Sequence, residues 1–191
     1  MSILSWFRRK STPPAPVVPE EMKVRFPRGV VPPVTTIGVA SENSGDIAST
    51  LAFVIHETCG WNVVTISTQY FVGNGVTAML GLKPGGGIDP VIGAQFEDVC
   101  ASVREYLDAQ YPGIWLRCLD NAVSRLPRHV FIVHGIAGED QADWVRARGG
   151  FVVGDGTVPG LSIDEPVGLD SESTYIQAAG RILDAMTHKG A

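Results

Sequence analysis

The chain has 191 residues, which is enough for one ordinary domain with an additional arm and too few for two full-sized domains. Hydrophobic residues make up 45% of the chain and charged residues 18%, so we expect a buried core over most of its length. No apolar run reaches the roughly 18 residues that a bilayer-spanning helix needs, so we expect no transmembrane segment. Three cysteines do not form a small disulfide framework and no signal peptide is recognisable, which favours a cytoplasmic protein.

The net charge of −5 is unevenly distributed along the chain. Residues 1–33 carry six basic and two acidic side chains, a net charge of +4, and residues 34–191 therefore carry −9. An acidic body repels polyanions, so we expect no nucleic-acid binding by its surface.

Residues 1–33 form a proline-rich segment, with seven of the thirteen prolines. Because proline lacks a backbone donor and blocks helix formation, we expect an extended or disordered arm. Its beginning combines apolar and basic side chains: Ile3, Leu4, Trp6, Phe7, Arg8, Arg9 and Lys10. Such a peptide could dock on a protein partner or on a membrane surface, and a frayed tail is the alternative.

From Val34 the pattern changes to alternating strands and helices, which makes residues 34–191 a separate domain. In chain order, we predict a strand at 34–40, a helix at 46–59, a strand at 61–67, a helix at 71–82, a glycine-rich loop at 83–90, helices at 96–110 and 114–125, a strand at 129–134, a helix at 139–148, a strand at 151–153 and a last helix at 173–188. Short buried strands separated by helices indicate an α/β, three-layer fold, in which a parallel sheet has helices on both faces.

The turn between the first strand and the first helix is where many α/β domains hold phosphate groups. Backbone N–H groups and the helix N-terminus cradle the phosphates there, and a lysine neutralises their charge. In this chain Asp46 stands at the lysine position, Glu42 adds a second carboxylate, and only Gly45 fits the glycine pattern. We therefore expect the loop to repel a triphosphate. The loop spacing falls on Ala40, Ser41, Glu42, Asn43, Ser44, Gly45, Asp46 and Ile47.

The strand expected at 129–134 runs into a helix that closes with Gly149 and Gly150 before the next strand. This order resembles a segment of the phage and bacterial deoxynucleoside monophosphate kinases. Two further pieces, Met79-Leu80-Gly81-Leu82 and Trp115-Leu116-Arg117, are similar to segments of the same family. The resemblance covers roughly residues 34–187 and implies a P-loop nucleotide-kinase fold.

The residues that carry the family's chemistry do not occur at the matching positions. Thr157 and Val158 stand before a Pro-Gly turn where the family has a lid arginine. The degenerate substrate-site positions are His134, Gly135, Ala137 and Gln141. Because phosphoryl transfer depends on cations placed around the transferred group, the resemblance implies a pseudokinase without catalytic residues.

The leading hypothesis is therefore an inactive kinase-like domain retained for binding or assembly, with the arm as a tether to a protein partner. The family's frequent phage origin suggests a host cytoplasm or a virion as its location. We expect no cofactor and no metal. One alternative is an active kinase that transfers phosphate from ATP, with magnesium, through the cations Lys83, Arg146 or Arg148. A second is a nucleotide-binding sensor without catalysis, and a homo-oligomer is compatible with either reading.

Other titratable clusters are interpreted as structural. Glu97, Asp98, Glu105 and Asp108 give one predicted helix an acidic, solvated face. Cys100 lies on an apolar face of the same helix and is expected to be a small core residue.

Overall fold

The computed structural model describes residues 36–167, 177 and 179–185. The predicted arm and part of the last predicted helix lie outside the described residues. The elements are β1 (Thr36–Ala40), α1 (Ser44–Cys59), β2 (Val63–Ser67), α2 (Thr68–Leu80), α3 (Phe96–Gln110), α4 (Ile114–Ser124), β3 (Val130–His134), α5 (Glu139–Arg146), β4 (Phe151–Gly154) and β5 (Glu165–Pro166). Residues 177 and 179–185 are helical.

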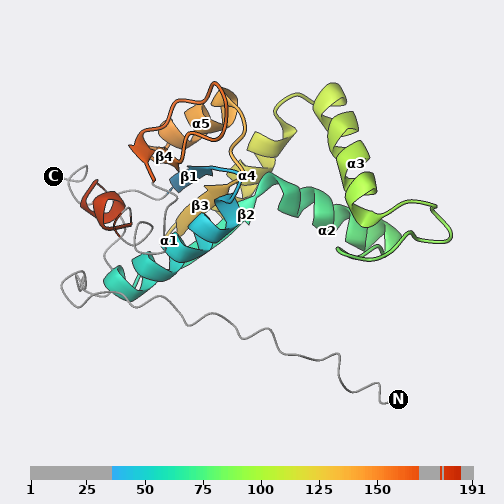
Figure 1. Cartoon of the computed structure of the whole chain (residues 1–191), viewed down its shortest axis with the longest axis horizontal. Coiled ribbons are helices and arrows are strands. Elements are labelled where there is room, and N and C mark those ends of the chain that lie inside the picture. Colours follow the sequence, from blue (N-terminus) through green and yellow to red (C-terminus); the bar gives the residue numbers. More distant parts are fainter. Residues whose placement is uncertain (1–35, 168–176, 178, 186–191) are drawn as a thin grey trace, which may run out of the picture.

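The five strands form one parallel sheet in the order β2-β3-β1-β4-β5 (Figure 1). The α/β prediction with a parallel sheet is confirmed, and α3 has the predicted bounds. Helix α2 begins three residues before its predicted start because the Ser67 hydroxyl accepts a hydrogen bond from the Tyr70 amide at 3.3 Å and caps it. Strand β5 was not predicted, since two residues that include a proline carry no alternating pattern.

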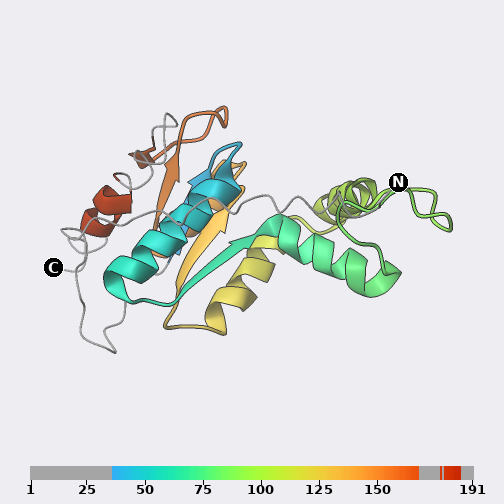
Figure 2. The same ribbon diagram turned by 60° about the horizontal axis from the view of Figure 1, so that its bottom comes forward.

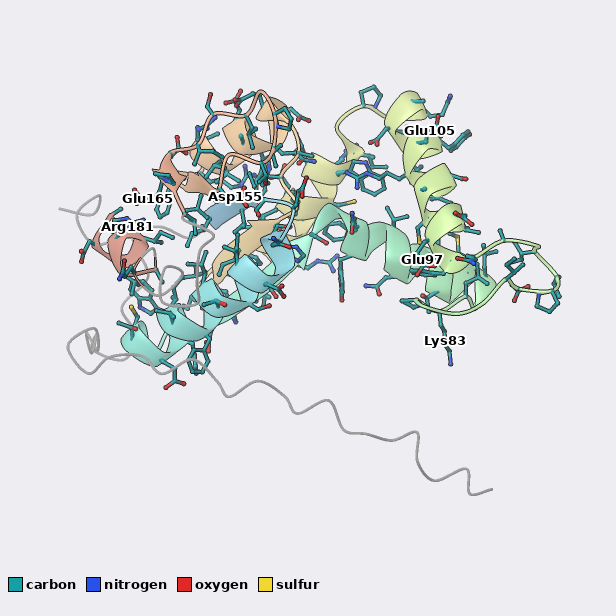
Figure 3. The ribbon with its side chains drawn as sticks, viewed as in Figure 1. Lys83, Glu97, Glu105, Asp155, Glu165 and Arg181 are labelled. Carbon is teal, nitrogen blue, oxygen red and sulfur yellow. The ribbon has the colours of Figure 1, made fainter. Side chains whose placement is uncertain are left out.

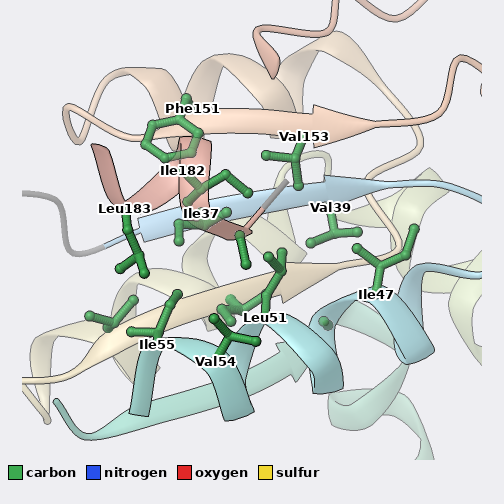
Figure 4. Close-up of a cluster of buried hydrophobic side chains, with 14 of the residues drawn as sticks. Ile37, Val39, Ile47, Leu51, Val54, Ile55, Phe151, Val153, Ile182 and Leu183 are labelled. Atoms are coloured by element: carbon green, nitrogen blue, oxygen red, sulfur yellow. The ribbon is translucent and has the colours of Figure 1, made fainter. Parts of the chain in front are cut away.

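Side chains of β1 alternate between the two faces of the sheet. Ile37 and Val39 pack with α1 and with Ile182 and Leu183 in one buried cluster (Figure 4). Ala40 belongs to a second cluster, which contains residues of α4 and α5. Helices therefore cover both faces of the sheet, as the sequence predicts.

Helix α1 shows why this core forms. Apolar residues at helical spacing give it a continuous buried stripe, and eight of its sixteen residues are buried. Gly60 ends the helix in the left-handed conformation at φ 68°, and its amide donates to the His56 carbonyl. Glycine ends the helix here because it adopts the left-handed conformation without steric cost.

Helices α2 and α3 project away from the sheet as a pair (Figures 1 and 2). They share a small cluster built around Val72, Val76, Leu82 and Trp115. None of the fifteen residues of α3 is fully buried. We call residues 68–110 the helical hairpin. Its cluster contains fewer buried residues than the clusters on the two faces of the sheet.

No helix among the described residues is both long and apolar enough to cross a bilayer.

Candidate functional site

The carboxyl ends of β1, β3 and β4 lie next to one another at one edge of the sheet. In the parallel register Val39 pairs with His134, and Ala40 pairs with Gly154. A Cβ on Gly154 would lie 2.4 Å from the Ala40 carbonyl oxygen, so only glycine permits this close approach. The loops that follow the three strands therefore converge, which is where ligands of parallel α/β sheets bind.

Asp155, the residue after β4, is hydrogen-bonded to the loop that follows β1. The Ser41 hydroxyl donates to its Oδ2 at 2.5 Å. The Thr157 amide and hydroxyl donate to its Oδ1 at 2.9 and 2.5 Å. We call Ser41, Asp155 and Thr157 the Asp155 cluster. A carboxylate of the chain itself thus accepts hydrogen bonds from two hydroxyl groups at this edge. Figure 3 labels the position of Asp155.

Most amides at the start of α1 already have acceptors within the protein. The Glu42 amide donates to the Thr157 hydroxyl at 3.3 Å, and the Asn43 amide donates to the Ser41 hydroxyl at 3.0 Å. The Ser44 amide donates to the Ser41 carbonyl at 3.2 Å. A phosphate cradle needs free N–H groups that converge on the anion, and three successive amides of this loop are occupied.

The charge of the site is negative. Partial burial acts to raise the pKa of Asp155, but the hydrogen bonds from Ser41 and Thr157 outweigh it and hold the pKa below its ordinary value. Asp155 is therefore ionised at neutral pH. The exposed Glu42 lies in the loop that its partner Ser41 belongs to, and the exposed Asp46 lies in the first turn of α1. Among the described residues, no lysine or arginine forms an ion pair or hydrogen bond with any of these three carboxylates.

The residues at the degenerate substrate-site positions stabilise the loop that follows β3. The Gln141 side-chain oxygen accepts from the Ala137 amide at 3.0 Å, and Gln141 is buried. Gly135 has φ 75°, a value that glycine adopts freely. Burial lowers the pKa of His134, so its ring is neutral at neutral pH and supplies no positive charge. The structure places His134, Gly135 and Ala137 at and after the carboxyl end of β3 and Gln141 in α5, and their contacts shape the loop.

The three cations that an active kinase could recruit are positioned elsewhere. Arg146 binds Glu139, Asp143 and Asp164 at 3.0–3.3 Å. Arg148 stacks on Trp144, 3.9 Å from the ring centroid, and pairs with Asp120. Lys83 follows the far end of α2 and lies well away from Asp155 (Figure 3).

A groove of about 330 Å³ lies between α2 and α3, away from the Asp155 cluster. Its lining is mainly apolar, with Val72, Phe96 and Cys100, and the charged Glu97 and Arg104 also contact it. No group of three or more potential metal ligands occurs among the described residues. Cys100 packs against the small cluster of the hairpin, as expected for a small core residue, and it is also partly exposed in this groove.

Sequence reasoning missed Asp155, which joins the two loops. A signal was present, because an acidic residue directly follows a buried strand and precedes Gly156 and Thr157. Asp, Gly and Thr in this order are typical of a turn in which the carboxylate accepts the amide two residues later. The partnership with Ser41 spans 114 positions, and no local pattern indicates it.

Comparisons with protein-family models, with curated proteins and with solved structures found no match to this chain.

Proposed function

We propose that residues 34–191 are a P-loop-kinase-like domain that has lost phosphoryl transfer and serves a binding or assembly role. The proposal rests on the resemblance to deoxynucleoside monophosphate kinases and on the chemistry of one edge of the sheet. A central first strand that leads through a turn into a buried helix, within a parallel sheet, is consistent with that fold.

The observation that carries the proposal is the position of the Asp155 carboxylate. It binds the hydroxyls of Ser41 and Thr157, and these in turn accept the amides of Asn43 and Glu42. A phosphate group would have to break these hydrogen bonds and would meet at least three carboxylates without a described counter-ion. Transfer of a phosphoryl group needs the opposite arrangement, with cations already positioned.

The active-kinase alternative requires Arg146 or Arg148 to leave multiple partners and reach this edge. Arg146 bridges α5 to the loop that precedes β5, also donating to the Ser162 carbonyl at 2.6 Å. Removing it from these partners would leave Glu139 and Asp164 without their cation. A nucleotide-binding sensor would also have to hold phosphate groups beside this negatively charged loop, unless it recognises a nucleoside without its phosphates.

The direct test is to incubate the full chain with ATP, magnesium and each deoxynucleoside monophosphate in turn. We expect no deoxynucleoside diphosphate, and no rise of the melting temperature with Mg-ATP. A ligand at a hundredfold excess over its dissociation constant adds about 2.7 kcal/mol of stability, so binding would be visible. Diphosphate formation from any of the substrates would overturn the proposal.

A gain-of-binding variant tests the physical cause. Asp46→Lys combined with Asp155→Asn restores a cation and removes the internal carboxylate. We expect this protein to bind pyrophosphate more tightly than the unaltered chain does. Asp140→Lys is the matched control, since Asp140 is also an exposed acidic residue in the first turn of a helix. An equal gain from the control would show that helix-terminal charge alone is responsible and that Asp155 does not block the loop.

A further inference from the structure

The helical hairpin carries most of the exposed apolar surface of the described residues. Of the nine large hydrophobic side chains that are exposed there, eight lie between Tyr70 and Tyr111. Val91 is 91% exposed and Met79 is 72% exposed. Exposed apolar side chains that are concentrated in one region are typical of an interaction region, and the groove lies in the same region, although none of these eight side chains lines it.

Within the described part of the chain, helix α3 is incompletely packed. Its apolar residues Val99, Val103 and Leu107 pack on the small cluster of the hairpin but stay partly exposed. A fifteen-residue helix with no fully buried residue gains little from its packing, and most helical stability in proteins comes from such burial. The groove of about 330 Å³ lies beside this face, and the residues of α3 that line it are Phe96, Glu97, Cys100, Ala101 and Arg104.

The surface around the groove is acidic. The hairpin carries two basic and five acidic side chains, a net charge of −3, and α2 has no charged residue. Glu97 lines the groove, and Glu105 lies two helical turns further along the same helix (Figure 3). The single cation of the groove, Arg104, is 3.8 Å from Asp108. The ligand that fits is an apolar peptide with adjoining positive charge.

We propose that the groove between α2 and α3 is the docking site for residues Ile3–Lys10 of the same chain. Trp6 and Phe7 supply aromatic side chains of the kind that fill such grooves, and Arg8, Arg9 and Lys10 supply three positive charges without an acidic neighbour. The aromatic side chains of the segment thus match the apolar lining of the groove, and its basic side chains match the acidic residues around the groove.

The connecting chain is long enough for this contact. Residues 11–35 are twenty-five residues, which can span up to about 80 Å. Strand β1 is about 17 Å long and α2 about 20 Å long, so the elements that separate Thr36 from the groove are short compared with this reach. Because the segment is tethered, its effective concentration near the groove is in the millimolar range, which favours it over a free peptide of equal affinity.

This inference rests on the proposed binding role of the domain, and it names the groove as the surface and the predicted arm, residues 1–33, as the segment that reaches it. A protein partner that takes the arm must then compete with the groove. No nucleotide is involved, so failure of the experiment below leaves the proposal about phosphoryl transfer unaffected.

Cys100 provides a reporter, because it lines the groove and carries a thiol that is only partly buried. The full chain and its Trp6→Ala/Phe7→Ala variant are treated with iodoacetamide, and the modification rate of each cysteine is followed by mass spectrometry. We expect Cys100 to react about tenfold faster in the variant, which corresponds to about 1.4 kcal/mol of docking free energy. The variant replaces no charged residue and no cysteine, so the net charge and the set of thiols are the same in both proteins.

Cys118 on α4 is the internal control, since it is also partly buried but does not line the groove. Its rate should be the same in both proteins. Equal Cys100 rates in the two proteins would overturn the proposal. A parallel rise at Cys118 would also overturn it, because that result indicates general loosening of the fold. Protection of Cys100 that increases with protein concentration would assign the groove to a second copy and would overturn docking within one chain.

Discussion

Two helices of nearly equal length, α1 and α3, are buried to very different extents in this molecule. Helix α1 has sixteen residues, eight of which are buried against the sheet, whereas α3 has fifteen and none is fully buried. Both show apolar residues at helical spacing, so the difference lies in what each helix packs against. Helix α1 faces a five-stranded sheet, whereas among the described residues α3 packs on α2 and part of α4. An amphipathic pattern predicts a helix, and the neighbouring elements decide how much stability it contributes.

The largest expected effect tests this difference directly. Leu51→Ala removes a side chain that is 1% exposed beneath the sheet and should lower the free energy of unfolding by about 3–4 kcal/mol. Leu107→Ala on α3 should cost less than about 1.5 kcal/mol, since Leu107 is only partly buried. Urea denaturation of both variants measures the two losses. Equal losses would mean that the hairpin is as well packed as the sheet.

A second variant tests the close approach of strands beneath the Asp155 cluster. Gly154→Ala places a Cβ 2.4 Å from the Ala40 carbonyl oxygen and should destabilise the protein by about 2–3 kcal/mol. Gly45→Ala is the matched control, because nothing lies within 4 Å of its added Cβ. Alanine is the better helix former, so the control should leave the melting temperature unchanged or raise it slightly.

Asp155→Asn tests the charged hydrogen bonds at the edge of the sheet. We expect a loss of about 1–2 kcal/mol at neutral pH, because hydrogen bonds to a carboxylate are replaced by weaker ones. Asp89→Asn on the hairpin is the comparison. Asp89 accepts from the amides of Val91 and Ile92 in an exposed loop, and its replacement should cost less.

The pH dependence of the same variant has a definite sign. The folded pKa of Asp155 lies below its ordinary value, so its contribution to stability is present above the ordinary pKa and is lost as the pH falls through the folded pKa. Melting temperatures measured from pH 7 down into this acidic range should fall less steeply for Asp155→Asn than for the unaltered chain. Parallel curves would contradict the lowered pKa.

The smallest effect is expected for Arg104→Gln. Its pair with Asp108 joins partly exposed side chains at 3.8 Å across one helical turn and should contribute less than about 0.5 kcal/mol. Arg146→Gln, which breaks contacts to three carboxylates, should cost more. A reversed order in chemical denaturation would show that α3 depends on its surface charges more than on its packing.

The succession of strands and helices was predictable because hydrophobic periodicity is a local property of the chain. The bounds of α3, the end of α1 at Gly60 and the buried strands β1, β3 and β4 all follow from residues within a few positions of one another. The carboxylates of the first loop were also visible in the sequence. Strand β5 was missed because its two residues form a strand only by pairing with β4.

Residue types and their spacing were thus sufficient to establish an α/β chain whose first loop is acidic and contains no lysine. Only the folded structure showed that Asp155 meets Ser41 across 114 positions, that Gln141 turns toward its own loop, and that no residue of α3 is fully buried. These facts depend on which distant segments become neighbours. A side chain's hydrogen-bond partners and its burial are set by the path of the whole chain, and that path is not encoded in any short stretch of sequence.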